Sequence, residues 1–177
     1  MDRKRRILLV EVIGTVFIIF VGSALHFTYA LSGNNSFAAF FSAVNESVWE
    51  HLKLAFWPSL FWLLIAMVPL KNIVGNFFAA KAVGAYVMVL FIPAVFYSYT
   101  SLTAESIFAI DIATFIVAVV VGQIFSYKLY KRRKSPRWVT IVAIIAVILL
   151  AIIFVAFTFY PPHFAIFQDS QTGNYGI

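Results

Sequence analysis

The chain has 177 residues, of which 63% are hydrophobic and only 11% are charged. Because a soluble domain carries roughly 25% charged residues, this composition excludes a single aqueous core and indicates a polytopic membrane protein with the lipid bilayer as its main partner. The net charge of +6 would also suit nucleic acid, but membrane topology explains it better, and no nucleic-acid partner is expected. The absence of cysteine excludes disulfides, thiolate metal sites and a cysteine nucleophile.

Five apolar segments predict an all-α bundle that forms a single membrane domain over residues 1–177. A helix needs about 20 residues to cross roughly 30 Å of hydrocarbon. Four segments have this length by themselves, and a fifth reaches it when its helix starts near Asn45. The predicted transmembrane helices are therefore 7–31, 46–70, 77–101, 106–127 and 138–160, and they precede an outer C-terminal tail, 161–177.

The distribution of Lys and Arg predicts a cytoplasmic N-terminus and an extracytoplasmic C-terminus in the cell membrane. With this orientation only Lys53 lies outside, and twelve of the thirteen basic residues lie on the cytoplasmic side: Arg3, Lys4, Arg5, Arg6, Lys71, Lys81, Lys128, Lys131, Arg132, Arg133, Lys134 and Arg137. The N-terminal segment could also be a signal peptide with DRKRR as its basic region. Because Glu11 interrupts its apolar run, an uncleaved first helix is the preferred interpretation.

The acids and histidines gather at the opposite end of this topology. Only Asp2 and Glu11 lie towards the cytoplasm, and the others lie at or near the outer face: His26, Glu46, Glu50, His51, Glu105, Asp111, His163 and Asp169. The positive-inside rule is largely blind to Asp and Glu, so it does not require this gathering. The pattern predicts an outward-facing polar site that contains histidine and carboxylate groups.

The stretch NESVWEHLKLAFWP marks the start of the second predicted span. Asn45 suits the N-cap position, and Glu46 suits the first turn, where the helix dipole favours an acid. At 100° per residue, Glu50 and Lys53 share one stripe, and His51 points about 100° away from Glu50. One interpretation is an interfacial helix end with Glu50 paired to Lys53. The other is a functional site, because capping and anchoring do not require two acids and a histidine together.

Two further polar residues lie inside predicted spans. His26 either bonds to a neighbouring helix or takes part in the site. An isolated carboxylate at the depth of Asp111 costs a few kcal/mol, so Asp111 must be neutral, paired or exposed to a wet cavity. We expect His26, Asp111, Glu50 and His51 to converge in one water-accessible pocket in the outer half of the membrane, because mutual pairing is the least costly way to keep them there.

These considerations give three sets of site residues. The candidate catalytic residues are Glu50, His51 and Asp111. The candidate ligand-binding residues are His26, Tyr29, Asn45, Glu46, Lys53, His163 and Asp169. Imidazole and carboxylate groups suit zinc, so a divalent metal such as zinc is one candidate cofactor, although ESVWEH matches no known zinc-protease motif and the sequence does not determine whether a metal is bound. The candidate metal ligands are His26, His51, His163 and Glu50.

The C-terminal tail also requires an explanation. Pro161 and Pro162 must end the last helix, because proline lacks a backbone donor and restricts its predecessor. The tail retains too much apolar surface for a frayed end in water: Phe164, Ile166, Phe167, Tyr175 and Ile177. We expect it to fold back over the outer site with His163 or Asp169; the alternative is an anchor that lies flat on the membrane.

Two sequence blocks resemble a family of small bacterial and archaeal membrane proteins that carries a domain-of-unknown-function label. They are HFTYALSGNNSFAAFFSAVNESVWEHLKLAFWP and FTFYPPHFAIFQDSQTGNYGI, and FYSYTS, DIATF and GQIFSYKL lie between them. The resemblance covers nearly the whole chain and implies no particular activity. The family pattern falls on His26, Tyr29, Asn45, Glu46, Trp49, Glu50, His51, Lys53, Asp111, Pro161, Pro162, His163, Asp169 and Gly176.

Three classes of function fit these features. The favoured one is a ligand- or metal-binding site, hydrolytic where it is catalytic, that acts on a small-molecule, ionic or lipid-like ligand. A small carrier or channel for a cation or proton is the second, although no inverted repeat supports it. A non-catalytic membrane assembly partner is the third. Bound metal, uptake into liposomes and co-purification of another protein would distinguish the three classes in that order.

The predicted orientation can be tested on the natural cysteine-free background. A cysteine introduced by Ser170→Cys should react with a membrane-impermeant maleimide in intact cells, and one introduced by Ser135→Cys should not, because the rule places these positions on opposite sides. Labelling after cell lysis controls for reactivity. The reverse pattern in intact cells would overturn the orientation.

Overall fold

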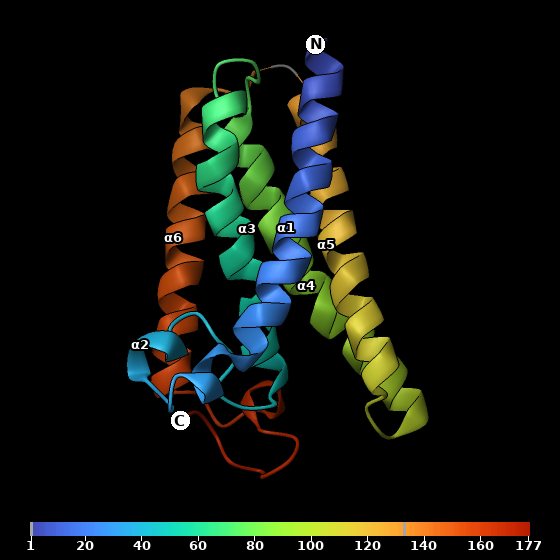
Figure 1. The fold of residues 1–177 in the computed structure, drawn as a ribbon, viewed down its shortest axis with the longest axis vertical. Coiled ribbons are helices and arrows are strands. Elements are labelled where there is room, and N and C mark those ends of the chain that lie inside the picture. Colours follow the sequence, from blue (N-terminus) through green and yellow to red (C-terminus); the bar gives the residue numbers. More distant parts are fainter. Residues whose placement is uncertain (1, 133) are drawn as a thin grey trace.

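The computed structural model describes residues 2–132 and 134–177, and the helices within these ranges form one bundle (Figure 1). They are α1 (Arg3–Leu31), α2 (Ser36–Ala39), α3 (Val48–Leu70), α4 (Phe77–Thr103), α5 (Phe108–Tyr130), α6 (Arg137–Phe159) and the short 3-10 helix η1 (Ala165–Phe167). All but α2 and η1 are long and apolar enough to span a membrane. The predicted all-α fold with five transmembrane helices is confirmed.

Helix α3 begins slightly later than its sequence suggests. Its N-cap is Ser47, whose hydroxyl accepts a hydrogen bond from the Glu50 amide at 3.3 Å. The expectation that Asn45 caps this helix is wrong, because the Asn45 side chain has other partners. Its amide oxygen accepts from the Ser47 amide at 3.0 Å, and its amide nitrogen donates to the Gly176 carbonyl at 2.9 Å. Asn45 thus links the loop before α3 to the C-terminal tail.

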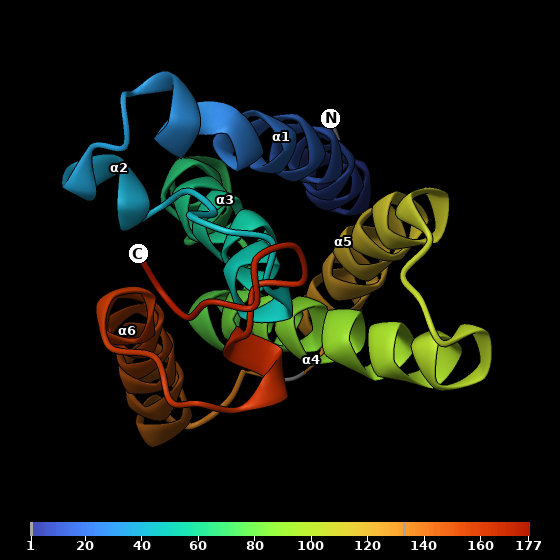
Figure 2. The ribbon, with the colours of Figure 1, turned by 90° about the horizontal axis from the view of Figure 1, so that it is seen from below.

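Helix α3 lies between α1 and α4, whereas α6 stands at the edge of the bundle (Figure 2). In the most apolar 18-residue stretch of each helix, 61% of α3 is buried inside the protein but only 11% of α6. Close approach of α4 and α5 depends on Gly84 and Gly122, since a Cβ atom on Gly122 would lie 2.7 Å from the Gly84 carbonyl oxygen. Most of α6 therefore faces lipid, and α3 carries the central contacts.

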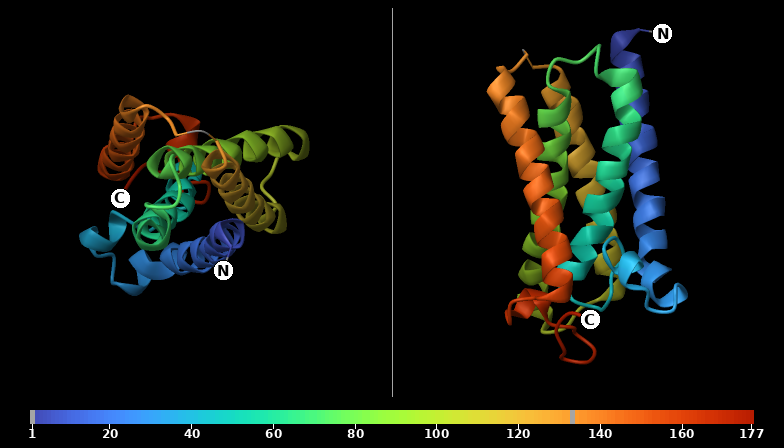
Figure 3. Two further views of the ribbon diagram at one scale, coloured as in Figure 1. Left: turned by 90° about the horizontal axis from the view of Figure 1, so that it is seen from above. Right: turned by 90° about the vertical axis from the view of Figure 1, so that its left-hand side faces the viewer.

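The connections divide between the two ends of the bundle. The N-terminus lies at the same end as the α3–α4 and α5–α6 connections, and the loop 32–47 and the C-terminal tail lie at the other end (Figures 1 and 3). The tail folds back onto the loop: the Ser170 hydroxyl donates to the Glu46 carbonyl at 3.1 Å, and Phe167 packs on Trp49 with ring centroids 4.8 Å apart. This fold-back agrees with the expectation from sequence.

A buried ion pair fixes the loop 32–47 against the helices. The Lys53 ammonium lies 2.6 Å from the Glu50 carboxylate, and the two side chains are 0% and 3% exposed. Lys53 also donates to the Ala39 carbonyl and to the Thr158 hydroxyl, each at 2.8 Å, so its three hydrogens all have acceptors. Glu50 accepts from Thr158 at 2.9 Å and from the Val44 amide at 3.0 Å. The pair thus joins α2, the loop, α3 and α6.

This ion pair should be essential for stability. Replacing one partner, as in Glu50→Gln or Lys53→Met, leaves a buried charge without its counter-charge, and we expect a loss of about 3–5 kcal/mol in the free energy of unfolding. The measurement is denaturant or thermal unfolding in detergent. Glu105→Gln is the matched control, because Glu105 is exposed at the same end. Equal stability of Glu50→Gln and Glu105→Gln would contradict this role.

Candidate metal centre

A close contact brings α1 and α3 together near the end of the bundle that carries the loop 32–47 and the tail. A Cβ atom on Gly22 would lie 2.3 Å from the Leu54 carbonyl oxygen, closer than any side chain could tolerate. Gly22 therefore lets α1 lie directly on the backbone of α3. One turn further along α1 is His26, and one turn before Leu54 on α3 is His51. The helix packing places the two imidazoles opposite each other.

The Ser42 side chain fixes the turn of α1 that carries His26. Its hydroxyl accepts a hydrogen bond from the Tyr29 amide at 2.9 Å and donates to the Leu25 carbonyl. In a regular helix those two backbone groups would bond to each other, so the fully buried hydroxyl is inserted into the helix ladder. The loop 32–47 is thereby attached to α1 at the level of His26.

Three side chains meet at this point. The Nε2 atoms of His26 and His51 are 3.2 Å apart. One Glu46 carboxylate oxygen lies 3.4 Å from the His51 Nε2 atom and 3.8 Å from the His26 Nε2 atom. The exposed fractions of the three side chains are 30% for His26, 33% for His51 and 37% for Glu46. We call His26, Glu46 and His51 the triad; its ligand atoms all lie within 4.8 Å of one another.

Hydrogen bonding assigns the tautomer of His51. Its Nδ1 atom lies 2.8 Å from the Ser47 carbonyl oxygen, which can only accept a hydrogen bond, so Nδ1 carries the proton and donates it. The Nε2 lone pair then faces His26 and Glu46. A carbonyl that fixes the far nitrogen of an imidazole in this way is the usual support of a metal-ligating histidine.

The triad has the dimensions of a metal site. Zinc binds imidazole nitrogen and carboxylate oxygen at about 2.0–2.2 Å, and ligands in a tetrahedron at those distances are roughly 3.3–3.5 Å apart. The observed separations of 3.2, 3.4 and 3.8 Å lie around this value. Two histidines and one glutamate leave a fourth position open, as in hydrolytic zinc enzymes. The same ligand set also suits Fe(II).

The charge state of Glu46 suits this role. The hydrogen bond with the His51 imidazole holds the pKa of Glu46 below its usual value, and partial burial opposes this shift without cancelling it. Glu46 is therefore a carboxylate at neutral pH, and metal ligands must be deprotonated.

Two of the expected site residues lie elsewhere. Glu50 and Lys53 form the buried ion pair that supports the loop, so Glu50 has no free oxygen for a ligand. The carboxylate beside the two imidazoles is Glu46. The expected convergence of four residues therefore brings together His26 and His51 but leaves out Glu50.

Asp111 lies on α5, apart from the triad. It accepts a hydrogen bond of 2.5 Å from the Tyr99 hydroxyl, which in turn accepts from the Ile107 amide at 3.1 Å. Beside Glu46, Asp111 is the acid whose charge acts on His51. Asp111 is thus paired, as its depth in the membrane requires, and it belongs to the surroundings of the site.

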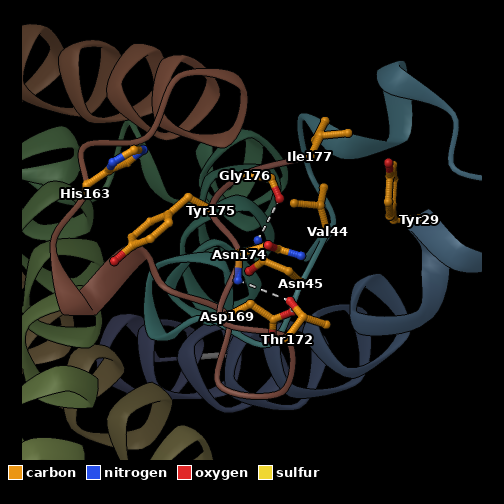
Figure 4. A pocket seen from close by; sticks show the side chains of 11 residues that line it. Tyr29, Val44, Asn45, His163, Asp169, Thr172, Asn174, Tyr175, Gly176 and Ile177 are labelled. Atoms are coloured by element: carbon orange, nitrogen blue, oxygen red, sulfur yellow. Dashed lines mark hydrogen bonds between the residues drawn. The ribbon is translucent and has the colours of Figure 1, made fainter.

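The remaining expected ligand-binding residues line a separate pocket of about 570 Å³ beneath the tail, which includes Tyr29, Asn45, His163 and Asp169 (Figure 4). His163 stacks on Tyr175 with ring centroids 4.5 Å apart. The Asp169 carboxylate accepts from the Gln171 amide and the Thr172 hydroxyl, and it shapes the turn of the tail. His163 therefore does not reach the two imidazoles of the triad.

Three residues that make polar contacts within the bundle were not recognised from the sequence. Ser42 and Tyr99 each resemble ordinary hydroxyl residues in an apolar chain, and no spacing distinguishes them. Lys81 counts among the basic residues of the cytoplasmic side, and the structure buries it inside α4, where it is 5% exposed and lies 2.7 Å from Glu11. It also donates to Gln123 at 3.3 Å. Two apolar spans that each carry one opposite charge at a similar depth are the signal that could have predicted this pair.

The contact at Gly22 can be tested without reference to a metal. Gly22→Val should force α1 away from α3, separate position 26 from position 51, and cost about 1–3 kcal/mol of stability. The readout is the yield of a short thiol cross-linker in a variant with His26→Cys and His51→Cys, which are its only cysteines. Ala24→Val, at an exposed position of the same helix, should leave the yield unchanged. Efficient cross-linking in the Gly22→Val protein would show that the contact is not needed.

Comparisons with known proteins add a family but no activity. No curated protein and no solved structure matches the chain. A family model described as a family of unknown function, DUF6512, matches residues 3–177. The resemblance inferred from the two sequence blocks is therefore confirmed, and the chain belongs to DUF6512.

Proposed function

We propose that this protein is a membrane-embedded metal-binding protein whose triad holds one divalent ion, with zinc as the first candidate, and that the bound ion supports hydrolysis. The observation that carries the proposal is the set of three ligand atoms at tetrahedral spacing, with the His51 tautomer set by a backbone carbonyl. A catalytic zinc ion needs three protein ligands and one open position.

The chemistry follows from the open position. A zinc ion lowers the pKa of a bound water to about 7 and polarises a carbonyl oxygen as a Lewis acid. Asp111 is the acid beyond the triad whose charge acts on His51, and the hydrogen bond from Tyr99 of α4 fixes its side chain. In this proposal Asp111 acts as the general base or orients the water, which keeps the catalytic role expected for it from sequence.

The triad lies on the extracytoplasmic side in this proposal. The described basic residues at the N-terminus and in the α5–α6 connection gather at the end of the bundle opposite the triad (Figure 1). The positive-inside rule assigns such an end to the cytoplasm. The cell membrane, with the N-terminus inside and the C-terminus outside, is the location that this distribution supports.

A cation or proton carrier is the second function to consider, because Glu11 and Lys81 form another polar cluster nearer the N-terminal end. Between this cluster and the triad lies a layer of buried apolar side chains, one each from α1, α3, α4 and α5: Ile18, Phe56, Met88 and Val119. This packed layer weighs against a continuous polar path in the present conformation. A site open on one side only, as in an enzyme, fits the arrangement better.

The metal proposal is tested by elemental analysis of the purified protein. The natural protein should hold about one zinc ion per chain after loading, and His26→Ala, His51→Ala and Glu46→Gln should each lose it, because two ligands rarely hold zinc. Zinc at 100 times its dissociation constant should also raise the free energy of unfolding by about 2.7 kcal/mol.

The controls use the same residue types at the same end of the protein. His163→Ala and Glu105→Gln should retain zinc, because neither side chain belongs to the triad. A natural protein that takes up no divalent metal, or triad variants that bind it as well as the controls do, would overturn the proposal.

A further inference from the structure

The triad lies at a defined depth in the membrane. Helix α1 becomes apolar at Ile7, directly after the last of its basic residues. From Ile7 to His26 the helix rises about 29 Å at 1.5 Å per residue, and the hydrocarbon core is about 30 Å thick. His26 therefore lies at the outer boundary of the hydrocarbon. At this boundary a membrane lipid carries the carbonyl groups that join its acyl chains to its polar part.

The loop 32–47 and the tail border the triad on its water side. The main chain of Glu46 bonds to the tail through Ser170, and the neighbouring Asn45 bonds to Gly176. The tail lies beyond the end of the bundle in Figure 1. The loop and the tail therefore lie on the axial side of Glu46.

The exposed surface of the triad faces sideways. Between Glu50 and Ser59, His51 is the only residue of α3 that is not buried. Its neighbours are His26 on α1 and, electrostatically, Asp111 on α5. Helices α1 and α5 touch at Gly22, where a Cβ atom would lie 2.8 Å from the Phe115 ring, and they diverge beyond that point (Figure 1). The exposed part of His51 thus lies between the diverging ends of α1 and α5.

Apolar side chains flank this opening on both helices. Phe27, next to His26, is 61% exposed, and Phe108 and Ile112, on either side of Asp111, are 80% and 45% exposed. In a chain whose spans lie in lipid, these surfaces contact acyl chains. A molecule that enters between α1 and α5 meets hydrocarbon-like walls first and the polar triad at the end.

From the depth, the loop and tail on the water side, and the apolar flanks, we infer that the triad receives a membrane amphiphile from the outer leaflet, with its acyl carbonyl group beside the water at the open metal position and its acyl chain along α1 and α5. This inference rests on the proposed metal centre and names its substrate class. Hydrolysis at that carbonyl consumes one water and breaks the acyl C–O or C–N bond. It releases a fatty acid and an alcohol or amine, so no other reactant is needed.

The experiment maps lipid contacts on the full-length protein. The protein is loaded with zinc and reconstituted in vesicles of phosphatidylethanolamine and phosphatidylglycerol that contain a phosphatidylethanolamine with a photoreactive diazirine close to one acyl carbonyl. After illumination, mass spectrometry locates the adducts. We expect adducts on 22–27 and 108–116 severalfold above those on 152–159 of α6, which lies at the same depth, because Thr158 bonds to Glu50 next to His51, and which serves as the internal control.

A second arm tests the opening itself. Ser23→Cys with Ile112→Cys, joined by a flexible thiol cross-linker, should suppress the adducts at the triad and leave zinc binding intact, because neither side chain is a ligand. Val83→Cys with Val142→Cys joins α4 to α6 away from the triad and should change nothing. Reduction of a cleavable cross-linker should restore the adducts.

Zinc content, measured on the same samples, separates the two proposals. Bound zinc with adducts spread over all helices in proportion to their exposure would overturn the amphiphile site and leave the metal centre standing. Concentrated adducts without any zinc binding would overturn the metal centre and support lateral entry. If the natural protein gives concentrated adducts, and His51→Ala and Glu46→Gln each lose both the adducts and the bound zinc, the metal centre and the amphiphile site are both supported.

Discussion

A lysine with no exposed surface, inside a bundle of apolar helices, constrains the half of this protein that carries the loop 32–47 and the tail. Lys53 can remain charged there only if each of its hydrogens has an acceptor, and the acceptors come from α3, α2 and α6. Such a pair contributes little net stability relative to an apolar core, but breaking it is costly. Its main effect is on geometry, since it holds the loop 32–47 at one height against the helices through Ala39 and Val44.

The triad depends on that loop in two ways. Glu46 belongs to it and approaches His51 only because the segment from Val44 to Ser47 is held by Glu50, Asn45 and the tail. Ser42, in the same loop, enters the backbone ladder of α1 and orients the turn that carries His26. A buried ion pair that binds no metal thus supports the loop that positions Glu46 and the turn that carries His26. This relation explains why the charged residues of the 45–53 stretch lie so close together in sequence.

Much of this arrangement could be predicted from sequence, and the exceptions have physical causes. The five spans follow from length and hydropathy, which a bilayer enforces strictly. The gathering of His26 and His51 at one end follows from sorting the charges by topology. The choice between Glu46 and Glu50 could not be made, because it depends on Thr158, a residue more than one hundred positions away that takes up Glu50. Glu50 and His51 point about 100° apart around the axis of α3, which already indicated that their side chains contact different partners. The cap at Ser47 was missed because Asn45 is an equally good capping residue and only the tail contact occupies it.

The two buried ion pairs also explain why the end that carries the triad can bind a ligand independently of the other end. Glu11 and Lys81 join α1 to α4 near the N-terminal end, as Glu50 and Lys53 join the loop to α3 and α6 near the other end. The layer of Ile18, Phe56, Met88 and Val119 between them is almost completely buried, so a change at the triad meets a rigid apolar core before it reaches Glu11 and Lys81. A coupled movement of the two ends would require α1, α3, α4 and α5 to repack this layer. Binding at the triad involves only the ends of α1 and α5 near the tail. An arrangement of this kind favours chemistry at one face of the membrane over transfer across it.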